Sequence, residues 1–212
     1  MRRYIAEFLG TFSLILIGTG TAALTNADPL TISLAFGLTF AAMATIFQPF
    51  TDGQFNPAIT LGQALNSKLP WTEALWVVLS QLIGAILASG LVRILALNLG
   101  NAANALGQTT SRLDWPVVLL TEGILTTILV LGFLILDDTD HPLAGFFNGI
   151  LLAALTLVGY GLTGPALNPA RALAPALYVG SDAIAQVWLY IVGPLLGAVV
   201  AAGINRFFRT TD

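Results

Sequence analysis

The chain reads as a duplication, and this feature restricts its fold more than any other. AEFLGTFSLILIG at 6–18 is similar to TEGILTTILVLGF at 121–133, and SQLIGAILASG at 80–90 is similar to GPLLGAVVAAG at 193–203. Each half also carries an Asn-Pro-Ala triplet, in FNPAI at 55–59 and in LNPAR at 167–171. The three matches share nearly one offset, from 112 to 115 residues. We therefore predict a single domain over 1–212, made of two homologous halves at about 1–97 and 115–212.

The composition assigns this duplicated chain to a membrane. It is 56% hydrophobic and only 9% charged, whereas a soluble domain carries about 25% charged residues. A helix needs about 20 apolar residues to cross the hydrocarbon core of a bilayer. Apolar segments of about that length predict six spans, at 5–24, 31–49, 71–92, 116–136, 142–161 and 184–205.

The two triplets predict helices that do not cross. Asn caps a first helical turn, and Pro suits the first helical position because its missing N–H has no partner there. About 11 residues follow each Asn-Pro, giving a helix of only ~16 Å, about half the hydrocarbon thickness. Such a helix must enter the membrane and remain buried against protein, because lipid cannot satisfy its free backbone ends.

The count of spans fixes how the halves are oriented. Each half has three spans and one half-helix, and because three is odd the second half enters from the opposite face, as an inverted repeat. The half-helices then meet N-terminus to N-terminus near the midplane. A helix N-terminus is electropositive and offers free N–H donors. The site therefore suits a neutral solute with lone pairs, which Asn56 and Asn168 can bind, and it opposes cations and protons.

Arg171 directly follows the second triplet, within about one turn of this centre and on its extracellular side. A charged residue within a membrane segment is costly and usually marks a permeation path. Its guanidinium donates hydrogen bonds to a permeant and repels cations.

The whole chain resembles the aquaporins, the major intrinsic protein family. The residues that carry the resemblance are AEFLGTF, SLAFGL, DGQFNPAITLG, TGPALNPAR and GPLLGA. It implies an all-α membrane fold of six transmembrane helices with two re-entrant half-helices, assembled as a homotetramer with one pore per subunit. It also implies that the pore motifs are Asn56, Pro57, Ala58, Asn168, Pro169 and Ala170.

The family narrows its pore with a ring of four residues, and counting from the motifs predicts Phe36, Thr156, Pro165 and Arg171. Strict water channels usually have His at the position of Thr156, so the smaller Thr predicts a wider opening. The glycerol branch typically has two aromatic residues in the ring and an Asp after the arginine, where this chain has Ala172.

Further along the chain, Tyr190 resembles the water branch, whereas Ile191 replaces the Trp expected beside it. We expect water to be the main permeant, with leakage of glycerol, ammonia or hydrogen peroxide. The alternative is a glycerol or small-solute facilitator of the same fold.

Glu7 and Glu122 are carboxylates within predicted spans, and such residues usually have a function. A proton-coupled secondary transporter would use them as a relay. The family resemblance instead implies buried acceptors that hold the backbone N–H groups of the two dipping loops, and their symmetric placement favours this role. A non-conducting packing protein would leave Arg171 uncompensated, and no catalytic constellation indicates an enzyme.

Several partners are not expected. The chain has no cysteine and one histidine, so we predict neither a metal site nor a cofactor, and its eight scattered basic residues do not favour nucleic acid. The group Asp137, Asp138, Asp140 and His141 resembles a weak metal cluster but is interpreted as a solvated turn. The larger group of basic residues, Arg2, Arg3, Lys68, Arg206 and Arg209, places both termini in the cytoplasm. Compact loops and short tails indicate a prokaryotic plasma membrane.

Overall fold

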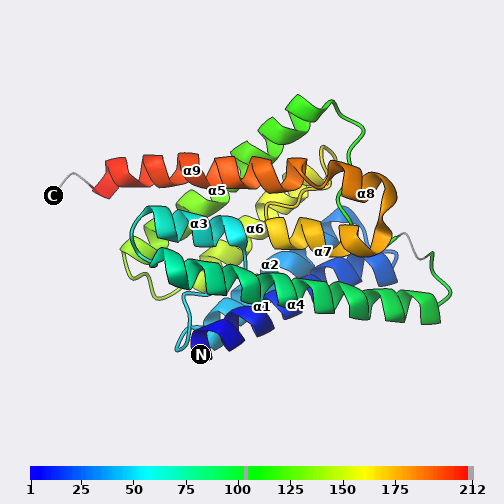
Figure 1. Cartoon of the computed structure of the whole chain (residues 1–212), viewed down its shortest axis with the longest axis horizontal. Coiled ribbons are helices and arrows are strands. Elements are labelled where there is room, and N and C mark those ends of the chain that lie inside the picture. The colour runs from blue at the N-terminus through cyan, green and yellow to red at the C-terminus, as the bar shows by residue number, and fades with distance from the viewer. Residues whose placement is uncertain (103–104, 210–212) are drawn as a thin grey trace.

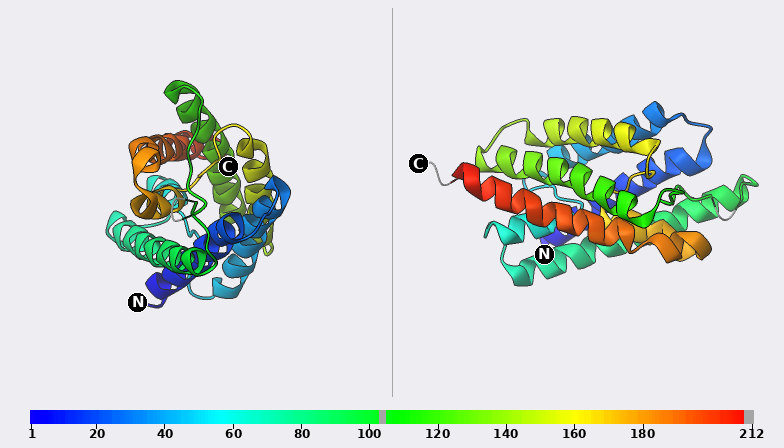
Figure 2. Two further views of the ribbon diagram at one scale, coloured as in Figure 1. Left: turned by 90° about the vertical axis from the view of Figure 1, so that its right-hand side faces the viewer. Right: turned by 90° about the horizontal axis from the view of Figure 1, so that it is seen from above.

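Helices make up nearly all of the computed structural model, which describes residues 1–102 and 105–209. Within these ranges the helices are α1 (Arg2–Leu24), α2 (Pro29–Phe47), α3 (Pro57–Leu65), α4 (Trp71–Asn98), α5 (Trp115–Asp138), α6 (Ala144–Tyr160), α7 (Pro169–Val179), α8 (Ser181–Gln186) and α9 (Leu189–Arg209). The described residues contain no strand. The end-on view in Figure 2 shows the long helices grouped around one axis.

Six of these helices coincide with the predicted spans. Five are long and apolar enough to cross a membrane, namely α1, α2, α4, α5 and the stretch Ser181–Arg209 that ends in α9. The sixth, α6, is apolar but has 17 residues, a length of about 26 Å. The predicted all-α membrane fold is therefore confirmed. The prediction missed the six-residue α8, which lies just before α9.

The same packing pattern occurs in both halves. In the first half α1 packs against α4 and α2, and in the second half α5 packs against α9 and α6. Glycines permit the closest approaches: a Cβ on Gly84 would lie 2.5 Å from Phe8 O, and one on Gly197 would lie 2.4 Å from Gly123 O. The halves meet where α2 packs along α6.

The two short helices α3 and α7 lie end to end between α4 and α9 (Figure 1). They contain nine and eleven residues, so each spans about half of a ~30 Å hydrocarbon core. Each begins at the Pro of an Asn-Pro-Ala triplet, and its Asn is the N-cap. The two predicted half-helices are therefore present.

The N-terminus and the last turn of α9 lie at one end of the bundle, which we call the terminal end (Figures 1 and 2). There the guanidinium of Arg3 pairs with Glu73 at 3.0 Å. At the same end Arg209 donates to Asn66 O at 3.1 Å, so the last helix is tied to the loop that follows α3.

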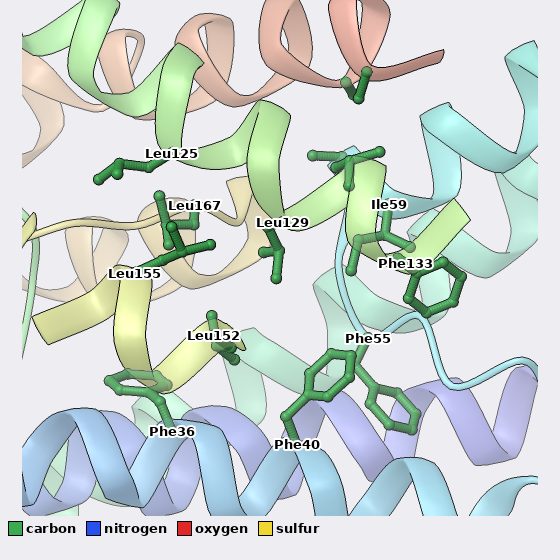
Figure 3. Packing of buried hydrophobic residues seen from close by; sticks show 14 of the residues in the cluster. Phe36, Phe40, Phe55, Ile59, Leu125, Leu129, Phe133, Leu152, Leu155 and Leu167 are labelled. Atoms are coloured by element: carbon green, nitrogen blue, oxygen red, sulfur yellow. The ribbon is translucent and has the colours of Figure 1, made fainter. Parts of the chain in front are cut away.

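The main apolar core lies between the two halves. Figure 3 shows side chains of α2, α5 and α6 converging there with Phe55 and Leu167, the residues that precede the two triplets. The rings of Phe40 and Phe55 meet edge to face at 5.8 Å. This core holds the start of both half-helices against the long helices.

Candidate functional site

Asn56 and Asn168 join the two half-helices at their N-termini. Within its own half, Asn56 Oδ1 accepts from Ala58 N at 2.9 Å, and Asn168 Oδ1 accepts from Ala170 N at 3.0 Å. Across the halves, Asn56 Nδ2 donates to Leu167 O at 2.8 Å, and Asn168 Nδ2 donates to Phe55 O at 2.9 Å. The contacts are reciprocal, so the two electropositive helix ends face each other. An amide nitrogen carries two hydrogens, and the cross-contact uses one of them.

The residues that supply those carbonyls have an unusual backbone. Phe55 has φ 47° and Leu167 has φ 54°, in the left-handed region that bulky residues rarely adopt. Such a conformation costs about 1–3 kcal/mol and persists only where the surroundings enforce it. Here a buried carboxylate provides the constraint in each half.

Glu7 holds the first loop. Its Oε1 accepts from Thr51 Oγ1 at 2.5 Å and from Gln54 N at 3.0 Å. Its Oε2 accepts from Phe55 N at 2.8 Å and from Gln81 Nε2 at 2.8 Å. The side chain is fully buried, and four donors therefore compensate for its loss of solvent.

Glu122 holds the second loop in a similar way. Its Oε1 accepts from Thr163 Oγ1 at 2.7 Å, and its Oε2 accepts from Leu167 N at 2.9 Å and from Ala166 N at 3.2 Å. This loop has an additional tie, because Tyr190 Oη donates to Thr163 O at 2.7 Å. Both carboxylates therefore accept hydrogen bonds from backbone N–H groups of the loops, as the predicted supporting role requires.

Arg171 carries a buried positive charge one residue beyond the second triplet. Its guanidinium lies 5.3 Å from the centroid of the Phe36 ring, within the range of a cation–π contact. Its Nη1 is buried and has no hydrogen-bond partner within the part of the chain that the structure describes. This nitrogen therefore carries hydrogens that no described residue accepts.

The four residues expected to form a ring lie close to one another. Thr156, Pro165 and Arg171 line a cavity of about 130 Å³ together with Gly107, Gln108 and Tyr160. Phe36 joins the group through its contact with Arg171. The cavity thus combines the guanidinium of Arg171, the small hydroxyl of Thr156 and the side chains of Gln108 and Tyr160 with the apolar ring of Pro165.

Several supporting side chains were not predicted from the sequence. Thr51 and Thr163, which donate to the two carboxylates, are 112 residues apart, the same offset as Asn56 and Asn168. The repeat alignment therefore contained that signal. Gln81 stands in a predicted span, where a polar side chain normally requires a partner.

Gln54 and Thr60 extend the contacts around Gln81. Thr60 Oγ1 donates to Gln54 Oε1 at 2.7 Å and accepts from Gln81 Nε2 at 3.0 Å. Gln54 Nε2 is buried and has no hydrogen-bond partner among the described residues. This network continues from Glu7 to the first turn of α3.

The two acidic residues that end α5 form ion pairs. Lys68 Nζ lies 2.5 Å from carboxylate oxygens of both Asp137 and Asp138. Burial lowers the pKa of Lys68, but its hydrogen bonds and the charges of these two carboxylates outweigh that effect and raise the pKa above its usual value. No group of three or more metal-ligating side chains occurs in 1–102 and 105–209.

Comparisons with known proteins agree with this arrangement. The sequence profile described as "Major intrinsic protein" matches residues 1–205. A "Glycerol uptake facilitator protein-like 6" of Lactiplantibacillus plantarum is 38% identical, with 100% of each chain covered. An "Aquaporin Z" of Rhodopseudomonas palustris is 34% identical over 96% of this chain and 92% of that protein. Among solved structures, the aquaglyceroporin of Plasmodium falciparum superposes with a TM-score of 0.87 at 24% identity, covering 99% of this chain and 96% of that one.

Proposed function

The chain belongs to the major intrinsic protein family, and we propose that it is a passive channel for water and small neutral solutes. It is a membrane transport protein and not an enzyme. We further propose one channel domain in two inverted halves, at about 1–97 and 115–212. The observation that carries the function is the reciprocal pair of amide–carbonyl contacts, which brings two helix N-termini together near Arg171, whose Nη1 has no hydrogen-bond partner among the described residues.

The mechanism of passage follows from these charges. A solute oxygen at the junction accepts from the remaining amide hydrogens of Asn56 and Asn168. A water held by two donors points its own hydrogens away, so it cannot relay a proton through this point. The two positive helix ends and Arg171 repel cations. A neutral molecule loses little free energy on leaving bulk water, because N–H donors of the protein replace the water donors that it gives up.

We assign the loop-supporting role to Glu7 and Glu122. Each carboxylate accepts from two consecutive backbone N–H groups, at Gln54 and Phe55 in one half and at Ala166 and Leu167 in the other. Protonation would weaken these contacts, because a neutral carboxyl is a poorer acceptor. This favours a channel over a proton-coupled transporter, and it predicts solute flux that does not respond to a pH gradient.

We assign selectivity to the ring of Phe36, Thr156, Pro165 and Arg171. One relative is named a glycerol uptake facilitator and another an aquaporin, and the small side chain of Thr156 supports passage of both permeants. The ring has a single aromatic side chain and a polar guanidinium, a combination that supports water as the main permeant.

Stopped-flow light scattering on proteoliposomes tests this assignment. Water and glycerol permeabilities are measured for the wild type, Thr156→His and Thr156→Val, with empty liposomes as the baseline. We expect histidine to lower the ratio of glycerol to water permeability roughly tenfold, equivalent to about 1.4 kcal/mol of barrier. The valine control, which keeps the size of threonine, should leave the ratio within twofold. A glycerol flux equal to that of empty liposomes in the wild type would refute the glycerol component.

Topology and assembly are also proposed. The basic residues of the terminal end, Arg2, Arg3, Lys68, Arg206 and Arg209, support cytoplasmic termini, whereas Arg93 and Arg112 belong to the other side. The bacterial relatives support a prokaryotic plasma membrane. Assembly as a homotetramer with one pore per subunit follows from the family resemblance.

A further inference from the structure

An apolar groove follows the outer side of both half-helices. It has a volume of about 580 Å³ and is lined by residues of α3, α4, α7 and α9. Figure 1 shows how α3 and α7 lie between α4 and α9. Pro57 and Pro169, the first residues of the half-helices, form part of its floor. Its walls include Leu82 of α4, Leu173 of α7 and Leu195 of α9. Since the half-helices meet near the midplane, the groove lies at the depth of lipid hydrocarbon.

An occupant of the groove does not have to supply a hydrogen-bond partner for Thr60. Its hydroxyl, on Thr60, already donates to Gln54 Oε1 and accepts from Gln81 Nε2. Trp71, at the start of α4, lines the groove at the terminal end, and its side chain is 61% exposed. Trp is enriched at the boundary between headgroups and hydrocarbon. The groove therefore extends from the headgroup level to the midplane, the depth reached by one acyl chain.

The positively charged side chain of Arg206 lies at the headgroup end of the groove. On α3, residues 57, 61 and 65 are four apart and share one face, and Arg206 Nη2 donates to Leu65 O. On α9, Leu195 and Arg206 are 11 residues apart, about three turns, so Arg206 lies on the same face about 16 Å nearer the terminal end. Arg206 is exposed, and no carboxylate within the described ranges forms an ion pair with it.

We propose that this groove is a lipid site that holds one acyl chain of an anionic phospholipid, whose headgroup lies at Arg206. The apolar lining complements the acyl chain, and the guanidinium of Arg206, whose charge no carboxylate of the described residues neutralises, complements the phosphate. The bound chain packs against Pro57, Leu61, Pro169 and Leu173, and therefore braces the sides of both half-helices. Ile191 forms part of the groove wall, and its aliphatic side chain is compatible with an acyl chain in the groove.

Native mass spectrometry of the purified full chain tests the site directly. The probes are phosphatidylglycerol and phosphatidylcholine with identical acyl chains, each added at the same ratio. One exposed arginine attracts an anionic headgroup by about 1 kcal/mol, so we expect the wild type to retain phosphatidylglycerol about fivefold more than phosphatidylcholine. The readout does not involve flux and is therefore independent of the proposed channel function.

Two pairs of variants separate the groove from the general surface. Ile191→Trp fills the groove and should lower retention of both lipids at least fivefold, whereas Val192→Trp, on the exposed neighbouring position outside the lining, should change it less than twofold. Arg206→Gln should abolish the preference for phosphatidylglycerol and preserve phosphatidylcholine binding. Arg93→Gln, at the opposite end of α4, should preserve the preference.

The contradicting results are equally specific. The groove would be excluded as the site if Ile191→Trp retained as much phosphatidylglycerol as the wild type. It would also be excluded if Val192→Trp lost as much phosphatidylglycerol as Ile191→Trp. A preference that survives Arg206→Gln would overturn the headgroup assignment. Helix content by circular dichroism checks folding, and if Ile191→Trp fails that check, the smaller Ile191→Phe is used and should give an intermediate loss.

Discussion

The two half-helices, with the loops that lead into them, share a backbone design and differ in charge. In both, a residue in the left-handed region precedes the capping Asn, and a buried glutamate accepts from the backbone. Three residues after Asn56 comes Ile59, fully buried in the apolar core, whereas the same step from Asn168 leads to Arg171. The duplicated halves thus form a symmetric scaffold. Arg171, at the position that matches Ile59, adds a positive charge in the second half only.

The supports of the two loops also differ. The first loop relies on the amide of Gln81, which bonds both Glu7 and Thr60. The second relies on the hydroxyl of Tyr190, which bonds the backbone at Thr163. The first loop therefore has its additional hydrogen bond at the carboxylate, and the second loop, which leads to Arg171, has its additional hydrogen bond at the backbone.

Removal of the carboxylates should have the largest effect. Glu7→Ala leaves the N–H groups of Gln54 and Phe55 and the amide of Gln81 without this acceptor, at about 1–3 kcal/mol for each group. We expect a loss of roughly 4 kcal/mol or more, and a smaller loss for Glu122→Ala because no side-chain amide is left unpaired. Thermal unfolding followed by circular dichroism in detergent compares the two variants. Equal melting temperatures would show that Gln81 contributes nothing to the difference.

Gln81→Leu should have the next largest effect. It removes a hydrogen bond to a buried carboxylate, which is worth about 1.5–3 kcal/mol. The same melting experiment should show a clear destabilisation, and Glu7→Ala should cost less in the Gln81→Leu background than in the wild type. Additive losses in this double-mutant cycle would contradict a coupled network.

Arg171→Val tests the charge that distinguishes the halves. It removes the guanidinium from the ring and leaves an apolar side chain of smaller volume. We expect glycerol permeability to rise about tenfold, equivalent to about 1.4 kcal/mol, and cation exclusion to weaken. Ile59→Val at the matched position of the first half serves as the control and should change neither flux. Unchanged glycerol and cation fluxes in Arg171→Val would remove Arg171 from the selectivity assignment.

Tyr190→Phe should give the smallest change. It deletes one hydroxyl that donates to Thr163 O, a loss of about 1 kcal/mol. The melting temperature should fall slightly and water permeability should stay near that of the wild type. A loss as large as that of Gln81→Leu would mean that the second loop depends on this tie as strongly as the first depends on its amide.

Much of this architecture was predictable from the sequence because apolar length and Asn-Pro capping are local signals. The six spans and both half-helices follow from them. The helix α8 was missed because it is one short stretch of six residues after Gly180, with no apolar period to mark it. The tie between Arg206 and Leu65 joins residues 141 apart in the chain, so only the folded packing of α9 against α3 brings it about.

The central claim is that neutral molecules pass between two opposed helix N-termini that exclude protons. Its most direct test is to record water and proton flux together, in proteoliposomes loaded with a pH-sensitive dye and subjected to an osmotic step. We predict protein-dependent water flux that is linear in the gradient, with proton flux no greater than in empty liposomes. Water flux that saturates, or that is accompanied by protein-dependent proton entry, would contradict the account.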